Sequence, residues 1–276
     1  VSIVIPNKDE KDTLKACLES IKEKTTYPSY EIVIVENNSQ TSEIFEYYKE
    51  IDGKDGIRVV TWKEPFNYSK INNFGFQYAK GDYVICLNND ITVITPSWIE
   101  EMLGYCQRPG TGIVGVRLYF PDDTIQHAGI GFGFLTLAAH MHKNFPVGHP
   151  GYMGRLSYAQ DVYAVTAACL MVRKDVYEQV NGLDESFAVA FNDVDFCVRV
   201  REAGYTNVFT PFAQLYHYES KSRGLDESPA KRKRFASEVE RFQKRWAKQL
   251  AAGDPCMNPN FDLMKEDFSF DIKPLE

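Results

Sequence analysis

Several kinds of sequence feature are missing from this chain, and each absence excludes a class of protein. No apolar run approaches the ~20 residues that a membrane-spanning helix needs, and the sequence does not open with a signal peptide. The glycine-rich phosphate loops GxGxxG and GxxxxGKS/T do not occur. The net charge of -7 argues against a general nucleic-acid binder.

Cysteine is present but follows no metal-binding or redox pattern. None of the six cysteines belongs to a CxxC pair, and most of them lie inside apolar runs, where a thiol behaves as a small hydrophobic side chain. This usage favours a reducing compartment, and we expect the cytoplasm.

The composition is that of a folded globular protein. The chain has 276 residues, of which 44% are hydrophobic and 25% charged, so it can bury a sizeable core in one large or two closely joined domains. Because Val1 already lies in a predicted strand, we expect a domain of a longer, multi-domain chain, whose flanking parts hold anchors or partner domains.

The N-terminal part alternates strands and helices. Buried strands are predicted at 1–6, 31–35 and 57–61, and helices with apolar residues at helical spacing follow the first and the third. Polar residues come directly after each strand. This order predicts an α/β fold with a parallel sheet covered by helices on both faces.

A further buried strand, 83–87, ends in Asn88, Asn89 and Asp90. Ligands of open α/β sheets bind at the carboxyl ends of the strands. A carboxylate flanked by two amides suits a divalent cation that keeps most of its shell as water and substrate phosphate. The alternative is that these three residues only cap a turn.

The second half of the sequence is less regular. Thr95–Pro96 predicts the N-cap and first turn of a helix, and 112–120 predicts a strand. From 121 to 155 the pattern dissolves into Gly, His, Phe and Pro, which is typical of a functional loop or lid. A helix is expected over 192–203 and a last strand at 207–211.

Residues 229–250 form the clearest amphipathic helix, with Phe235, Val239, Phe242 and Trp246 on one face. The opposite face is basic and leaves two interpretations open. One is a docked helix with a solvated charged face; the other is contact with anionic lipid head groups, which vesicle sedimentation would test. The basic residues are Lys231, Arg232, Lys233, Arg234, Arg241, Lys244, Arg245 and Lys248.

Four titratable residues lie at predicted strand ends or helix starts and could build one site: Asp90, Asp193, Asp195 and His217. Each also has a structural interpretation. Acids favour a helix N-terminus, Asp195 fits a capping position, and His217 can be a hydrogen-bonded core histidine. His140-Met141-His142 could be a metal pair on a strand, although its loop-like surroundings favour a structural role.

The ordered set of motifs resembles the family 2 glycosyltransferases of the GT-A fold, over almost the whole chain. Further stretches resemble the bacterial subgroup that builds rhamnan, O-antigen and other surface polysaccharides: 66–73, 125–129 and 254–260. The motifs of the first resemblance are Ser2-Ile3-Val4-Ile5-Pro6, Ile34-Val35-Glu36-Asn37-Asn38-Ser39, Leu87-Asn88-Asn89-Asp90, Asn192-Asp193-Val194-Asp195 and His217.

The resemblance implies a role for each matching residue. Asp90, in the Asp-x-Asp place, would bind Mg²⁺ or Mn²⁺ on the donor diphosphate with His217 as a later ligand, and Asp193 would be the general base. Pro6 and Glu36 take the places that hold the nucleobase and ribose. The residues expected to bind the nucleotide sugar are Pro6, Glu36, Asn38, Lys70, Asn88 and Asn89.

Two positions depart from the family pattern. Asn88 replaces the first acid of the Asp-x-Asp motif, which leaves less negative charge on the metal, and Asn192 replaces the usual Glu before Asp193. The assigned roles nevertheless agree with the chemistry. Sugar transfer needs a neutralised leaving diphosphate and a deprotonated acceptor hydroxyl on the opposite face of the anomeric carbon, which implies inversion.

The sequence therefore predicts a GT-A α/β fold and an inverting, metal-dependent glycosyltransferase. We expect it to act on the cytoplasmic side of the membrane, moving a sugar from a UDP- or dTDP-linked donor to an oligosaccharide or lipid-linked glycan. The expected segments are a nucleotide-sugar-binding half, 1–110, an acceptor-binding half, 111–220, and a C-terminal helix and tail, 221–276.

Two other functions are weighed against this one. A sugar-1-phosphate nucleotidyltransferase shares a similar sheet, but its glycine-rich basic loop after the first strand is absent here. A catalytically degenerate glycan- or nucleotide-binding module of a polysaccharide synthase is suggested by Asn88 and Asn192, and slow hydrolysis of a nucleotide sugar would distinguish an enzyme from it.

Overall fold

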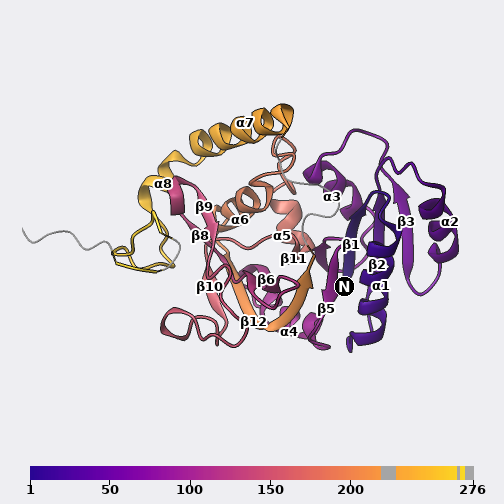
Figure 1. The fold of residues 1–276 in the computed structure, drawn as a ribbon, viewed down its shortest axis with the longest axis horizontal. Coiled ribbons are helices and arrows are strands. Elements are labelled where there is room, and N and C mark those ends of the chain that lie inside the picture. Colours follow the sequence, from indigo (N-terminus) through magenta and orange to yellow (C-terminus); the bar gives the residue numbers. More distant parts are fainter. Residues whose placement is uncertain (219–227, 266–267, 271–276) are drawn as a thin grey trace, which may run out of the picture.

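The structure, a computed structural model, describes residues 1–218, 228–265 and 268–270 (Figure 1). The expected C-terminal segment 221–276 therefore lies partly outside the described residues. The helices are α1 (Lys11–Lys24), α2 (Ser42–Ile51), α3 (Tyr68–Phe76), α4 (Trp98–Cys106), α5 (Lys174–Gln179), α6 (Asn192–Glu202), α7 (Pro229–Arg245) and α8 (Ala247–Ala252).

A ten-stranded sheet runs through the molecule in the order β10-β12-β6-β11-β4-β1-β2-β3, with β5 paired to β12 and β7 to β6. A separate two-stranded sheet joins β8 to β9. The strands are β1 (Ser2–Asn7), β2 (Glu31–Glu36), β3 (Ile57–Thr61), β4 (Tyr83–Leu87), β5 (Ile91–Val93), β6 (Thr111–Tyr119), β7 (Ile125–His127), β8 (Ile130–Phe132), β9 (Ala138–His140), β10 (Gln160–Val162), β11 (Cys169–Arg173) and β12 (Thr206–His217).

The predicted α/β fold with a mostly parallel sheet is confirmed. β1 pairs in parallel with β2 and β4, and β2 with β3. Successive residues of a strand point to opposite faces: Ile3 and Ile5 of β1 pack in one core with α1, α2 and α4, while Val4 packs in the other with α3, α5 and α6. Burial on both faces explains why these strands are continuous apolar runs in the sequence.

Three features before α7 differ from the sequence-based expectations: the start of α4, the segment 121–155 and the end of the last strand. Helix α4 begins at Trp98 with Ser97 as its N-cap residue, not at Thr95–Pro96. The segment 121–155 contains the short strands β7, β8 and β9, although it was expected to be a loop. Strands of three residues are too short to show a period, so the sequence pattern does not reveal them.

The predicted last strand does not end at Pro211. β12 continues to His217 through an irregularity between Thr210 and Gln214, and a bulge of this kind is where a sheet tolerates proline. It pairs in parallel with β6 on both sides of this bulge, and its last residues also pair antiparallel with β5, placing His217 opposite Ile91. The pairing with β5 thus brings the end of β12 beside the segment that follows β4.

Helix α7 has the predicted apolar face, with Phe242 and its C-cap residue Trp246 buried, but it ends at Arg245, and α8 continues after Trp246 where one helix over 229–250 was expected. Figure 1 shows α7 running over α6. Its basic face is only partly solvated, because Arg241 donates to the Ser186 carbonyl and Arg245 pairs with Asp184. Contact with anionic lipid through the remaining exposed cations stays a prediction. No helix of the described part is long and apolar enough to cross a bilayer.

Close packing at Gly115 of β6 gives a stability prediction. A β-carbon there would lie 2.5 Å from Cβ of Val165, which precedes the turn into β11. Gly115→Ala should therefore lower the free energy of unfolding by about 1–3 kcal/mol, the usual cost of overpacking. Urea unfolding measures this change.

Gly104, inside α4, is the matched control, because a β-carbon there would meet no atom within 4 Å. Gly104→Ala should stabilise the protein by roughly 0.5–1 kcal/mol, since glycine is unfavourable in a helix interior. Equal effects of the two substitutions would contradict the close contact at Gly115.

Candidate active site

The end of β4 presents three polar side chains in different surroundings. Asn89 is buried and donates from Nδ2 to Oδ1 of Asn7 at 2.6 Å, which ties the end of β4 to the end of β1. Asn88 is half-buried, and its backbone N–H donates to the Ala168 carbonyl. Asn89 thus has a structural partner, and its role with a donor stays a prediction.

Asp90 and His217 lie in contact because of the β12–β5 ladder. The N–H of Tyr218 donates to the Asp90 carbonyl at 2.9 Å, and His217 Nε2 lies 3.1 Å from Asp90 Oδ1. The same Nε2 lies 3.1 Å from Nδ2 of Asn88. Asp90 and His217, which are far apart in the sequence, therefore form one cluster at the predicted metal site. The carboxylate and the imidazole ring are both largely buried.

Gln126 of β7 orients the imidazole of His217. Its Oε1 lies 2.6 Å from His217 Nδ1, so the amide oxygen favours the tautomer with the proton on Nδ1. Nε2 then keeps its lone pair toward Asn88 and Asp90. This arrangement is typical of a histidine that ligates a metal through one nitrogen while a neighbour fixes the other. Sequence reasoning did not assign Gln126 to the site.

Asp193 lies in the first turn of α6, as predicted. Its Oδ2 accepts a hydrogen bond from the Ala167 N–H at 3.2 Å, and its Oδ1 accepts one from the Val194 N–H at 2.9 Å. Positive charge at a helix N-terminus stabilises an ionised carboxylate. The preceding Asn192 is buried and donates to the Val189 carbonyl, so it supports the turn that leads into α6.

A pocket of about 100 Å³ joins the two groups. Its lining includes Asn88 and His217 from the strand ends and Asp193 from α6. Tyr68 also lines the pocket and donates from its hydroxyl to the Ala167 carbonyl at 2.8 Å. The lining residues are Tyr68, Asn88, Thr166, Ala167, Ala168, Val189, Asn192, Asp193 and His217.

The other predicted donor residues lie at the same edge of the sheet but outside this pocket lining. Glu36 is buried, pairs in register with Asn7, and accepts the Ser39 N–H on Oε1 at 2.6 Å. Asn38 is exposed and donates to the Glu64 carbonyl. Pro6 is half-buried near the end of β1. Their roles with a nucleotide stay predictions.

Lys70 lies at the start of α3 and also outside the pocket lining. Its Nζ is 3.9 Å from Oε2 of Glu185, and both side chains are about half exposed. A surface ion pair of this length contributes little stability, so Lys70 is able to exchange this partner for another anion.

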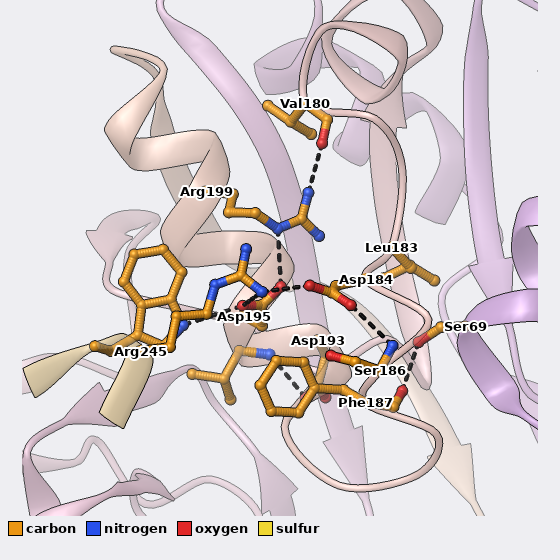
Figure 2. A network of polar contacts seen from close by, with 12 residues as sticks. Ser69, Val180, Leu183, Asp184, Ser186, Phe187, Asp193, Asp195, Arg199 and Arg245 are labelled. Atoms are coloured by element: carbon orange, nitrogen blue, oxygen red, sulfur yellow. Dashed lines mark hydrogen bonds and ion pairs between the residues drawn. The ribbon is translucent and has the colours of Figure 1, made fainter. Parts of the chain in front are cut away.

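Asp195 does not cap α6, contrary to one sequence interpretation. It is fully buried, its carboxylate bonds to Arg199 Nε at 2.8 Å and to the indole N–H of Trp246 at 3.0 Å, and Arg245 lies 3.3 Å away (Figure 2). Burial raises the pKa of Asp195, and the two arginines and the indole counteract this shift. Asp195 therefore joins α6 to α7 rather than facing the pocket.

The histidines 140 and 142 do not form a metal pair. His140 Nδ1 lies 2.9 Å from Nδ1 of His127, whereas His142 stacks on Phe268 and accepts the Tyr152 N–H. Burial lowers the pKa of His142 to about 3 and holds the pKa of His127 well below its usual value. Within the described residues, no group of three or more His, Cys, Asp or Glu side chains could hold a metal.

One cysteine close to the site has a structural role. Cys17 of α1 is buried, and its thiol lies 3.9 Å from the Asn88 carbonyl. Burial, together with the charge of Asp90, raises the pKa of the Cys17 thiol to about 12. The thiol therefore stays protonated and is not a nucleophile.

Comparison with known proteins places this arrangement in a family. The family model described as glycosyl transferase family 2 matches residues 2–180. An uncharacterized protein of Sinorhizobium fredii, y4gI, is 45% identical over 270 residues, covering 97% of this chain and 30% of that protein. The O-antigen biosynthesis protein RfbC of Myxococcus xanthus is 37% identical over 231 residues, covering 83% of this chain and 18% of that protein.

A solved structure has a similar fold. The mannosyltransferase PcManGT from Pyrobaculum calidifontis, in complex with GDP-mannose and Mn²⁺, superposes with a TM-score of 0.63 at 15% identity, over 90% of this chain and 64% of that one. This likeness is one of GT-A fold, as the sequence predicted. The chain spans less than a third of the length of the two relatives. Because the family model matches more than half of this chain, the chain belongs to glycosyl transferase family 2.

Proposed function

We propose that this chain is an inverting glycosyltransferase that moves a sugar from a nucleotide-diphosphate donor to a growing bacterial surface glycan. The observation that carries the proposal is that Asn88, His217 and Asp193 line the same pocket. It puts polar groups suited to a diphosphate beside a carboxylate suited to a hydroxyl. The likeness to an O-antigen biosynthesis protein supports a surface glycan as the acceptor.

Asp193 acts as the general base in this proposal. It takes the proton from the acceptor hydroxyl, the hydroxyl oxygen bonds to the anomeric carbon, and the bond from that carbon to the diphosphate oxygen breaks. Attack from the face opposite the leaving group inverts the anomeric centre. The Ala167 N–H bond to Oδ2 fixes the direction of the carboxylate, so that the base is positioned before the acceptor arrives.

Asp90 and His217 are suited to hold a divalent cation, Mg²⁺ or Mn²⁺. One carboxylate oxygen and one imidazole nitrogen that Gln126 orients converge at 3.1 Å, and such a sparse donor set leaves room for phosphate oxygens and water. The cation would neutralise charge on the departing diphosphate. The Mn²⁺ complex of PcManGT supports a metal in this fold.

The donor in this proposal carries UDP or dTDP, bound along the sheet edge by Pro6, Glu36, Asn38, Lys70, Asn88 and Asn89. The acceptor is an oligosaccharide or a lipid-linked glycan, reached from the cytoplasmic side of the membrane. PcManGT holds GDP-mannose, so the test panel contains UDP-glucose, dTDP-rhamnose and GDP-mannose, each with Mn²⁺. Slow hydrolysis of one donor indicates an enzyme; binding without any turnover would favour the degenerate module that Asn88 and Asn192 suggest.

One prediction of the proposed function concerns the general base. Asp193→Asn keeps the shape of the side chain but cannot take a proton, so turnover of the preferred donor should fall by the ~10²–10⁴-fold typical of a lost general base. The melting temperature and the nucleotide affinity should stay near wild type. Full activity in Asp193→Asn would defeat the mechanism.

Asp195→Asn is the matched control, two residues along the same helix. It weakens a buried cluster with Arg199 and Arg245, so it should cost stability on the order of 3 kcal/mol. The protein that remains folded should keep most of its turnover, because Asp195 does not line the pocket.

Another prediction of the proposed function concerns the metal. Because the chain offers so few ligands, Mn²⁺ should bind weakly to the protein alone and well only with UDP or dTDP present. Asp90→Asn should abolish the gain in nucleotide affinity that Mn²⁺ gives, as measured by calorimetry. Tight Mn²⁺ binding without nucleotide, retained in Asp90→Asn, would place the metal elsewhere.

A further inference from the structure

Helix α7 carries a buried acid that holds the segment leading to α6. Glu238 is only 2% exposed. Its carboxylate accepts three consecutive backbone N–H groups: Ala188 at 2.8 Å and Val189 at 3.0 Å on Oε1, and Ala190 at 3.1 Å on Oε2. Hydrogen bonds to an ionised carboxylate are stronger than those between neutral groups, and a buried carboxylate requires them.

The start of α3 holds the opposite edge of the same segment. The Tyr68 N–H donates to the Ala188 carbonyl at 2.8 Å. The Ser69 hydroxyl donates to the Phe187 carbonyl at 2.7 Å (Figure 2). Both Tyr68 and Val189 line the pocket. The segment 187–190 is therefore fixed between α7 and a wall of the candidate active site.

The segment ends in a residue with unfavourable backbone geometry. Phe191 has φ 61° and ψ 5°, in the left-handed region that aromatic residues rarely adopt. Its ring stacks on Phe242 of α7, with centroids 4.8 Å apart, and on Phe235 at 6.0 Å. Backbone strain of this kind persists only where the surrounding contacts hold it. The direction in which α6 begins thus depends on α7.

A second set of contacts joins α6 to the C-terminal end of α7. Asp195 of α6 accepts the indole N–H of Trp246 and lies 3.3 Å from Arg245 (Figure 2). Two buried carboxylates therefore connect these elements. Glu238 of α7 binds the segment before α6, and Asp195 of α6 binds Arg245 and Trp246. Asp193 lies between the Glu238 contacts and the Asp195 contacts along the chain.

From these contacts we propose that Glu238 is a positioning residue for Asp193, and that α7 completes the active site although the family model ends at residue 180. Glu238 and the aromatic face of α7 hold 188–191 so that the first turn of α6 directs Asp193 toward the pocket. This proposal rests on the glycosyl transfer proposed above.

Glu238→Gln tests the proposal, because its NH₂ group replaces one acceptor oxygen and leaves an N–H of the segment without a partner. We expect kcat for the preferred donor to fall roughly 10- to 100-fold through misplacement of the base. KM for the donor should stay close to wild type, whereas the melting temperature should fall modestly because of the unpaired N–H. Amide hydrogen exchange at 188–190 should become faster. Glu240→Gln, at an exposed acid of the same helix, should change none of these quantities.

Phe235→Ala is a second variant in case Glu238→Gln does not fold. Phe235 is 43% exposed, so its truncation puts little of the core at risk, yet it removes one of the two rings stacked on Phe191. We expect a severalfold lower kcat with unchanged donor KM. A fall in melting temperature with unchanged kcat would mean that α7 only stabilises the fold, and would overturn the proposal.

The hydrogen-exchange arm separates this proposal from the proposed function. If wild type turns over no donor of the panel, the transferase assignment fails. Exchange then decides the positioning contact alone: faster exchange at 188–190 in Glu238→Gln supports it, and unchanged exchange overturns it. If wild type is active and Glu238→Gln keeps full kcat, the positioning role is wrong while the transferase assignment stands.

Discussion

β12 pairs with β10, β6 and β5, and the arrangement of the candidate active site follows from its pairing with β5. It stays beside β6 before and after the bulge at Gln214, while its other edge pairs with β10 at 207–209 and with β5 at 215–217. The pairing with β5 places His217 beside Asp90, and His217 also lines the pocket. Backbone hydrogen bonds of the ladder, rather than the two side chains themselves, set their separation.

Much of the fold can be predicted from the sequence, because buried parallel strands appear as continuous apolar runs with polar residues at their ends. β1, β2, β3 and β4 are recognisable for this reason. β11, antiparallel between β4 and β6, and the course of β12 past Pro211 are not recognisable, because strand direction and bulges depend on partners distant in the chain. The start of α4 was also misplaced, since Thr95–Pro96 is a sequence signal for a cap that the structure does not use.

The candidate site shows the same division. Residue type and position at strand ends or a helix start indicate Asp90, His217 and Asp193; His217 and Asp193 line one pocket, and Asp90 lies beside His217. Gln126 and the Ala167 N–H are not predictable, because a glutamine within a three-residue strand and a backbone amide carry no distinguishing residue pattern. The place of Asp195 in the first turn of α6 favours a cap, yet apart from Arg199 of the same helix its partners are Arg245 and Trp246, some fifty residues later in the chain.

The route of β12 also has a consequence for how the chain reaches its native state. Thr206 pairs with Thr111, and His217 pairs with Ile91, so the strand that completes the sheet pairs with strands that are distant in the sequence. Such topology gives a high contact order, and closing these large loops slows folding. β1, β2, β3 and β4 with α1 and α3 have mostly nearer partners and can assemble first. Until β12 arrives, β6 presents an open edge, where intermolecular strand pairing competes with correct folding.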